Sequence, residues 1–204
     1  MGSLVRKLGL TAVALGLLVV VPSRAEAQGW LLDAYAGVGI PASNTKDFVK
    51  SGFSGGIGGG YIFNRYFGVR ADIAGEWLSG KDDTGEGIQL PILPEQPTSF
   101  PDLRLYHYDA SIMVTLTDLR TTSWLFAFDI GAGATTFQFS GTDAPDNKTK
   151  FTVPAGISVG YLLSEQVGLF VRGRWYLIFT GENDFNKSTW STFPIWLGIG
   201  IRAG

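Results

Sequence analysis

The chain of 204 residues contains no cysteine and a single histidine, and only 17% of its residues are charged. Without cysteine it has no disulfide framework, thiolate metal site, cysteine nucleophile or lipidated N-terminal cysteine. One histidine argues against a histidine-rich metal centre, and a net charge of −2 gives no basic footprint for nucleic acid. Disordered chains need low hydrophobicity and high net charge, whereas 45% of these residues are hydrophobic. We therefore expect a folded protein with no metal and no cofactor.

Residues 1–27 have the order of a secretory signal peptide. Two basic residues precede an apolar run over 8–21, and a small-x-small motif ends at Ala27. This run is shorter than the roughly 20 residues that a membrane-spanning helix needs. We expect cleavage after Ala27, which leaves 28–204 as one exported domain. No later apolar stretch reaches the length of a membrane helix, so the sequence predicts none in that domain.

Hydrophobic residues recur at every second position in the rest of the chain, which is the period of a β-strand. The runs lie at 30–40, 53–63, 67–77, 106–115, 124–134, 151–161, 167–177 and 195–202. Tight turns at 64–66, 117–123 and 164–166 alternate with long connections at 41–50, 79–102, 140–150 and 180–190. Short turns at one rim and long loops at the other are typical of bacterial outer-membrane barrels. The sequence thus predicts an all-β fold: an eight-stranded antiparallel up-and-down transmembrane β-barrel with short periplasmic turns, longer extracellular loops and both termini in the periplasm.

The charged residues indicate which face of the strands meets lipid. A charge that faces lipid at the bilayer midplane costs about 2–4 kcal/mol, and only Arg104 among the strand charges has the parity of the apolar face. The bulky apolar face also could not fit inside eight strands, because such an interior holds only packed side chains. We expect the apolar face to contact lipid and the small, polar, glycine-rich face to line the lumen. With the faces reversed, the chain would be a soluble lipocalin-like binder.

Four arginines and five acidic residues fall on the polar face, together with the single histidine. An unpaired buried charge is strongly destabilising, so we expect these residues to pair with one another and to plug the lumen. The predicted lumen network consists of Asp33, Arg70, Asp72, Glu76, His107, Asp109, Asp129, Arg172, Arg174 and Arg202. A narrow water-lined channel is the alternative, although eight strands leave little room for one.

Five features of the second half follow one another in a recognisable order. They are an aromatic strand start at Trp124, the Gly131-Ala-Gly133 step, the 151–161 strand, a tight turn and the 167–172 segment. In this respect the chain resembles the small eight-stranded outer-membrane β-barrel proteins of the OmpA-domain and OmpX/Ail-like kind. The resemblance implies an integral outer-membrane protein of a Gram-negative bacterium that serves envelope integrity, adhesion or surface protection.

The same resemblance implies partners. Outer-membrane lipid and lipopolysaccharide would surround the barrel, and the barrel-assembly machinery would insert it. Barrels of this kind commonly end in an aromatic residue that the insertion machinery reads, whereas this sequence ends in Ile201-Arg202-Ala203-Gly204.

His107, Asp109 and Ser111 share one strand face and include the residue types of an acyl-transfer triad. Some barrels that resemble this chain remove acyl chains from lipid A with a His-x-Ser pair that faces lipid, whereas this set is expected to face the lumen. Same-face neighbours on a strand are about 6.7 Å apart, so a direct relay would be stretched. We expect no catalytic residues and no enzyme activity, and a lipid A acyl hydrolase is the less favoured alternative.

The connection over 79–102 is the most individual segment. Its prolines recur near every third residue, which favours an extended polyproline-like backbone. Apolar residues accompany them: Ile88, Leu90, Ile92, Leu93 and Phe100. An exposed apolar strip is a candidate surface for an extracellular partner, and folding onto the barrel rim is the equal alternative. The sequence favours a non-enzymatic structural or surface-interaction role through such loops.

Overall fold

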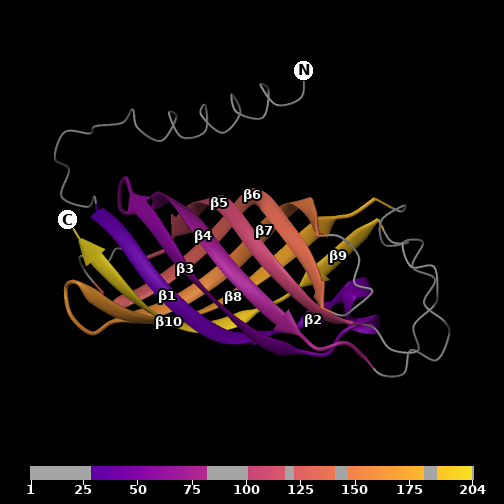
Figure 1. Cartoon of the computed structure of the whole chain (residues 1–204). Coiled ribbons are helices and arrows are strands. Elements are labelled where there is room, and N and C mark those ends of the chain that lie inside the picture. Colours follow the sequence, from indigo (N-terminus) through magenta and orange to yellow (C-terminus); the bar gives the residue numbers. More distant parts are fainter. Residues whose placement is uncertain (1–28, 82–100, 118–121, 141–146, 182–187, 204) are drawn as a thin grey trace, which may run out of the picture.

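The computed structural model describes residues 29–81, 101–117, 122–140, 147–181 and 188–203, and most of them lie in β-strands (Figure 1). The strands are β1 (Gly29–Gly39), β2 (Pro41–Ala42), β3 (Gly52–Ile62), β4 (Phe67–Leu78), β5 (Asp102–Thr115), β6 (Trp124–Ser140), β7 (Lys148–Leu162), β8 (Val167–Phe179), β9 (Thr189–Thr192) and β10 (Ile195–Ala203). A short 3-10 helix, η1 (Ser43–Asp47), lies between β2 and β3. Within the described ranges, no helix has the length and apolar character needed to cross a membrane. The predicted signal peptide lies outside the described residues.

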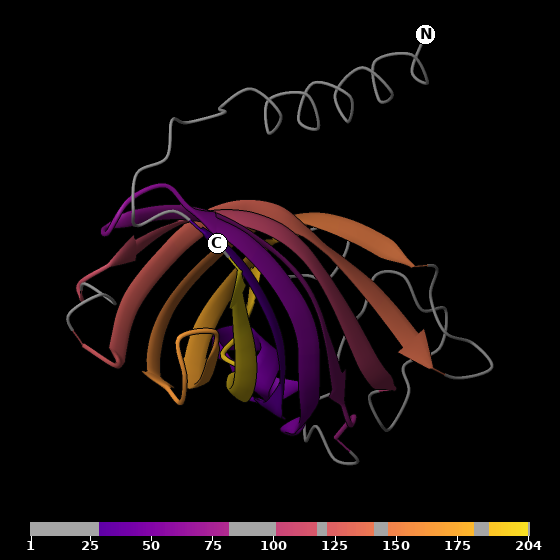
Figure 2. The ribbon, with the colours of Figure 1, turned by 90° about the vertical axis from the view of Figure 1, so that its left-hand side faces the viewer.

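The eight long strands form a closed antiparallel barrel. Each pairs with the next in the order β1, β3, β4, β5, β6, β7, β8 and β10, and β10 pairs with β1. The strands curve round a common axis when the barrel is viewed from the end where the C-terminus lies (Figure 2). The short strands β2 and β9 continue β1 and β10 toward the opposite end and pair with each other. The predicted all-β, eight-stranded up-and-down barrel is confirmed.

The strand registers give the barrel its stagger. A path from Leu31 through the paired residues, with the β6–β7 step taken from the register of the flanking pairs Ile130–Ala155 and Gly133–Thr152, passes once around the barrel. It arrives at Pro41, ten residues beyond its start. A closed barrel with such a stagger has strands that are strongly tilted to its axis, as Figure 1 shows. The lumen of eight strands is narrow enough for side chains to fill.

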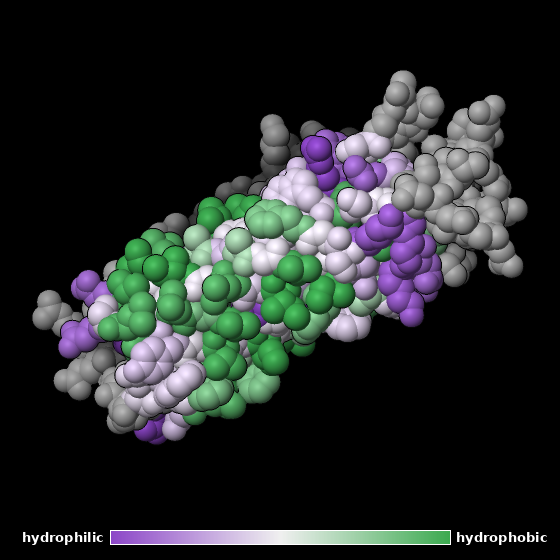
Figure 3. Space-filling model, turned by 90° about the horizontal axis from the view of Figure 1, so that it is seen from below, coloured by the Kyte–Doolittle hydropathy of each residue, from purple (hydrophilic) through white to green (hydrophobic). Residues whose placement is uncertain are grey.

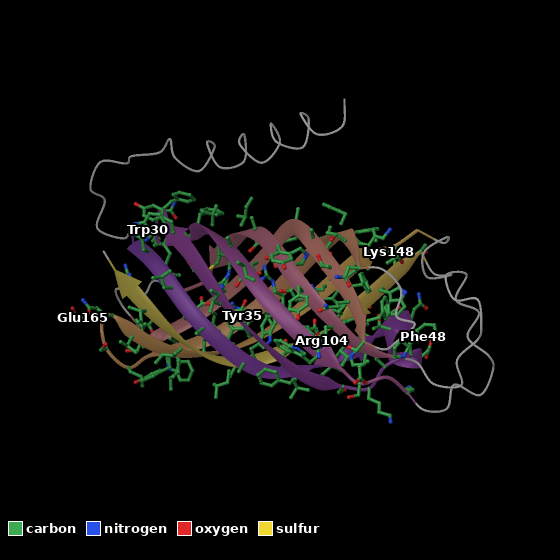
Figure 4. All side chains as sticks on the ribbon, in the orientation of Figure 1. Trp30, Tyr35, Phe48, Arg104, Lys148 and Glu165 are labelled. Carbon is green, nitrogen blue, oxygen red and sulfur yellow. The ribbon has the colours of Figure 1, made fainter. Side chains whose placement is uncertain are left out.

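Two tight turns lie at the end of the barrel that holds Trp30 and Glu165, which we name the terminal end (Figure 4). In each turn, a side chain at the first position binds the backbone. Asn64 Oδ1 accepts hydrogen bonds from the backbone N–H groups of Tyr66 and Phe67, at 2.9 and 3.0 Å. Ser164 Oγ accepts one from Val167 at 3.1 Å. Local side-chain bonds of this kind stabilise short hairpin connections. We name the opposite end, which holds Phe48 and Lys148, the loop end.

The outer surface of the barrel is apolar, as the alternation predicts. Trp30, Leu32 and Leu197 are each more than 60% exposed, whereas the alternate residues of the same strands face inward. On the face drawn in Figure 3, hydrophobic residues form a belt, with hydrophilic residues toward both ends. Aromatic pairs such as Trp124–Tyr161, with ring centroids 5.1 Å apart, and Trp77–Tyr106, 6.3 Å apart, lie on this outer surface. A lipid-facing belt with interfacial aromatic residues is typical of transmembrane barrels.

Candidate functional site

The middle of the lumen contains a ring of ion pairs centred on Arg174 of β8. One guanidinium nitrogen, Nη1, lies 3.0 Å from Asp72 Oδ2. The other, Nη2, lies 2.8 Å from Asp109 Oδ1 and 2.8 Å from Asp129 Oδ1, and donates to Ser111 Oγ at 3.1 Å. The Arg174 side chain has no exposed surface. One arginine therefore joins carboxylates from β4, β5 and β6 across the lumen.

Two further arginines complete this charged ring toward the terminal end. Arg70 binds Asp72 through both Nε and Nη2, each at 2.6 Å, and its Nη2 lies 3.1 Å from Asp33 Oδ1. Arg172 Nη2 lies 3.5 Å from Asp33 Oδ2, while its Nε donates to Ser158 Oγ at 3.0 Å. Two-point arginine–carboxylate contacts are among the strongest and most directional polar interactions in proteins.

Strand register explains why these side chains meet. Asp33, Gly58, Asp72 and Asp109 are consecutive partners on β1, β3, β4 and β5, so they point inward at one level. Gly58 supplies the space: a Cβ atom there would touch Arg70 Nη2 and would lie 2.5 Å from Asp72 Oδ1 and 2.7 Å from Asp33 Oδ1. The glycines on the polar face thus leave room for the charged ring.

A second buried pair lies above the ring, toward the loop end. His107 Nε2 lies 2.9 Å from Glu76 Oε1, and His107 Nδ1 lies 2.8 Å from Thr135 Oγ1. The imidazole stacks on Tyr176, with ring centroids 3.9 Å apart. The Thr192 hydroxyl donates to the same Glu76 oxygen at 2.7 Å. Glu76 and His107 are therefore engaged with each other and with hydroxyl groups.

The three residues with triad chemistry do not form a relay. His107, Asp109 and Ser111 do face the lumen from β5. However, His107 binds Glu76 and Thr135, whereas Ser111 Oγ accepts from Arg174. Both His107 and Ser111 are buried, at 1% and 5% exposure, so neither is presented to a substrate in the membrane or in solvent.

The lumen toward the loop end is apolar, which differs from the expectation of a polar lumen throughout. Leu78, Leu103, Leu105, Phe137, Ile178 and Trp190 have at most 2% exposure and belong to one hydrophobic cluster with Phe48. Phe48 follows η1 and stacks on Trp190, with ring centroids 5.3 Å apart. We name this cluster the apolar cap. It closes the lumen between the charged ring and the loop end.

The sequence contains a signal for the apolar cap, but it lies between the predicted alternating runs and the predicted connections. Leu103 and Leu105 precede the alternating run that begins at residue 106, and Phe137 follows the run that ends at residue 134. Here the alternation is inverted: the inward residues are apolar, and the outward Arg104 is charged and exposed. Strands that extend past the bilayer face water outside, so their apolar side chains turn inward.

The predicted network residues are thus distributed over three levels. The charged ring contains Asp33, Arg70, Asp72, Asp109, Asp129, Arg172 and Arg174, while Glu76 and His107 form the separate pair above it. Arg202 lies on β10 near the terminal end and is partly exposed. Among the ion pairs of the described residues, none includes Arg202. The predicted partner-binding residues Ile88, Leu90, Ile92, Leu93 and Phe100 lie outside the described residues.

A profile of one protein family matches almost the whole chain. The family is described as the outer membrane protein beta-barrel domain, and the match covers residues 11–193. A search of curated proteins found no match.

Solved barrels show the same fold. Neisserial surface protein A superposes with a TM-score of 0.60 at 15% identity, over 86% of this chain and 99% of that protein. Ail, the attachment invasion locus protein of Yersinia pestis in complex with the heparin analogue sucrose octasulfate, gives a TM-score of 0.52 at 15% identity, over 87% and 99%. OprG from Pseudomonas aeruginosa gives 0.54 at 12% identity, over 86% and 95%. At these identities the likeness shows the fold alone.

Proposed function

Since this chain belongs to the outer membrane protein beta-barrel domain family, we propose that it is a non-conducting outer-membrane barrel with a structural or surface-interaction role. Its extracellular loops would carry the interaction, and its lumen would serve as a rigid support. The observation that carries this proposal is that side chains fill the lumen from the charged ring to the apolar cap. Arg174, Glu76, Trp190 and Trp196 all lie inside the barrel and have no exposed surface.

The side chains that fill the lumen support a barrel that does not conduct ions. Ion conduction needs a continuous hydrated path, and eight strands provide only the space that side chains occupy. The charged ring holds its arginine and aspartate groups buried and in contact with one another, and the apolar cap lies above them. A permeating ion would have to break the ring pairs and then pass the apolar cap, whose apolar side chains cannot replace the ion's hydration.

Planar-bilayer recording tests this proposal. The purified barrel should insert without producing discrete conductance steps, and the variant Trp190→Ala, which opens the apolar cap while leaving the ring in place, should also be silent. Reproducible steps that change amplitude when Arg172 or Arg174 is neutralised would instead establish a narrow channel.

The loop-borne role is tested in cells. We compare a strain that lacks the protein with strains that carry the full chain or a chain without residues 82–100, and measure uptake of a hydrophobic dye as the index of envelope integrity. Restoration by both chains indicates a structural role of the barrel itself. Restoration by the full chain alone would assign the role to the loop. Restoration by neither chain would contradict both forms of the proposal.

We also propose the membrane arrangement that the sequence predicts. The signal peptide would be removed after Ala27, both termini would face the periplasm, and lipopolysaccharide would contact the loop-end half of the outer surface. The grouping of the tight turns at the terminal end supports this orientation. A protease added to intact cells should cleave within residues 82–100 but not at the 164–166 turn, and cleavage at that turn would reverse the orientation.

The proposal does not include enzyme activity. Support comes from the hydrogen bonds of His107, which connect it to Glu76 and Thr135 inside the barrel. Mass spectra of lipid A from cells with and without the protein should be the same. A loss of acyl chains that depends on the protein and disappears in His107→Gln would instead assign a lipid A acyl hydrolase.

A further inference from the structure

The lumen is not filled between the charged ring and the terminal end, and a cavity of about 70 Å³ lies there. Its walls are mostly apolar and include Leu31, Ile62, Met113, Leu125 and Phe170 from five different strands. We name it the vestibule. We propose that the vestibule binds the aliphatic tail of a single-chain anionic amphiphile of the fatty-acid class, with the anionic head at Arg202. This inference goes beyond the structural role proposed above and does not depend on it.

The vestibule exists because glycines replace inward side chains on neighbouring strands. Gly160, Gly168 and Gly200 line it from β7, β8 and β10. At Gly200, a Cβ atom would meet nothing nearer than 3.7 Å, in contrast to Gly58 at the charged ring, where a Cβ atom would collide with charged groups. Neighbouring side chains thus fill the space beside Gly58, whereas the space beside Gly200 is free.

The lining selects an apolar occupant. A buried water needs two to four polar partners, and the vestibule walls are formed mainly by aliphatic and aromatic side chains. An apolar cavity of about 150 Å³ in another protein stays dry and binds benzene. The vestibule has about half that volume, so it fits the end of an aliphatic chain, and the rest of the chain would extend through the open mouth.

The charges fix the orientation of this occupant. At the inner end of the vestibule, Arg70 and Arg172 are already paired with Asp33. The charged ring as a whole contains three arginines and four aspartates, so it offers no surplus positive charge to an anion. At the outer end, Arg202 lines the mouth, is partly exposed and lacks an ion pair among the described residues. A tail-first amphiphile therefore places its anionic head beside the available guanidinium.

Methionine-methyl NMR provides the test, because Met113 is the only methionine besides Met1 and its side chain lines the vestibule. The barrel, labelled with carbon-13 at the methionine methyl groups, is placed in phosphatidylcholine nanodiscs and titrated with dodecanoate. We expect a saturable shift of the Met113 methyl resonance. Since Met113 is only 4% exposed and faces inward, dodecanoate that dissolves in the surrounding bilayer does not contact it.

Two variants and a matched control separate the tail site from the head site. Gly200→Phe fills the vestibule and should abolish the Met113 shift, whereas Gly200→Ala adds one methyl group in open space and should retain it. Arg202→Gln should weaken dodecanoate binding about threefold to fivefold, the effect of an exposed ion pair. Binding of dodecan-1-ol, which has no charge to pair with Arg202, should be unchanged. The shift of electrophoretic mobility on boiling checks that each variant is folded.

The outcomes decide the proposal. No saturable Met113 shift in the wild-type barrel would overturn it, and so would an equal shift in folded Gly200→Phe. Equal weakening of dodecanoate and dodecan-1-ol by Arg202→Gln would retain the tail site and reject the head site. If Gly200→Phe fails to fold, Leu125→Trp provides a second way to fill the vestibule from β6.

Discussion

Among the three arginines of the charged ring, Arg174 pairs with the largest number of carboxylates. It contacts three aspartates, and removing it leaves buried carboxylates without their partner. Loss of one member of a buried ion network costs about 3–5 kcal/mol. We expect Arg174→Ala to lower the free energy of unfolding by about that amount, measured by tryptophan fluorescence during urea unfolding in lipid vesicles.

The matched control is Arg65→Ala. Arg65 lies in an exposed turn with its guanidinium 4.5 Å from the ring centre of Tyr66. Exposed contacts of this kind contribute about 0.5–1 kcal/mol. If Arg174→Ala and Arg65→Ala shift the unfolding midpoint equally, the charged ring does not stabilise the barrel.

Gly58 and Gly59 are adjacent residues with opposite environments. A methyl group on Gly58 would enter the charged ring, whereas one on Gly59 would face lipid, 3.3 Å from Leu32 Cδ2 at the nearest. Forcing extra volume into a packed interior costs about 1–3 kcal/mol. We expect Gly58→Ala to lower the urea midpoint clearly and Gly59→Ala to change it little. The reverse order would mean that the two faces of β3 are exchanged.

At the scale of elements, η1 and the residues after it depend on Trp190 of β9. The backbone N–H groups of Phe48 and Val49 donate to Thr45 O at 3.2 Å, and Phe48 stacks on Trp190. A large-to-small change of a buried tryptophan costs about 3–5 kcal/mol. Trp190→Ala should therefore increase deuterium uptake of the 43–50 segment, as measured by mass spectrometry.

The control for this prediction is another tryptophan. Trp30 is 62% exposed on the outer surface, so Trp30→Ala should leave uptake of the 43–50 segment unchanged. Unchanged uptake in both variants would show that η1 is held without the apolar cap.

The sequence predicts the strands well because lipid and lumen impose opposite requirements on alternate residues. The predicted run 67–77 corresponds to β4, and the predicted run 167–177 to β8, within two residues. The prediction is less complete toward the loop end, where β5 and β6 continue beyond the runs to Asp102 and Ser140. There the outer surface meets water and the pattern inverts. A prediction that requires a lipid-facing apolar side therefore makes these two strands too short.

The partners within the charged ring could not be predicted for a different reason. Alternation has a period of two, so a strand shifted by two residues keeps the same faces but brings different side chains to one level. Whether Arg174 meets Asp72 depends on every register between β4 and β8. Arg202 illustrates the limit, because it shares the inward face with Arg172 and Arg174 and still lies outside the charged ring.

At the scale of the whole molecule, closure of the barrel predicts the behaviour of the protein on a gel. Every strand of the barrel has a partner on both sides, so the folded form has no free edge from which unfolding could begin. Protein from an outer-membrane fraction should resist extraction by urea and migrate differently before and after boiling. A protein released by urea, with the same mobility in both lanes, would contradict an integral barrel.

The charged ring also has a consequence for the order in which the molecule assembles. Arg174 and Asp72 are 102 residues apart in sequence and meet only across the lumen. The contacts of Arg174 therefore form only once β8 lies opposite β4, whereas the Arg70–Asp72 pair lies within β4 alone. Interactions formed after the transition state leave the folding rate nearly unchanged and slow unfolding. We therefore expect the Arg174 contacts to slow unfolding of the assembled barrel more than they change its folding rate.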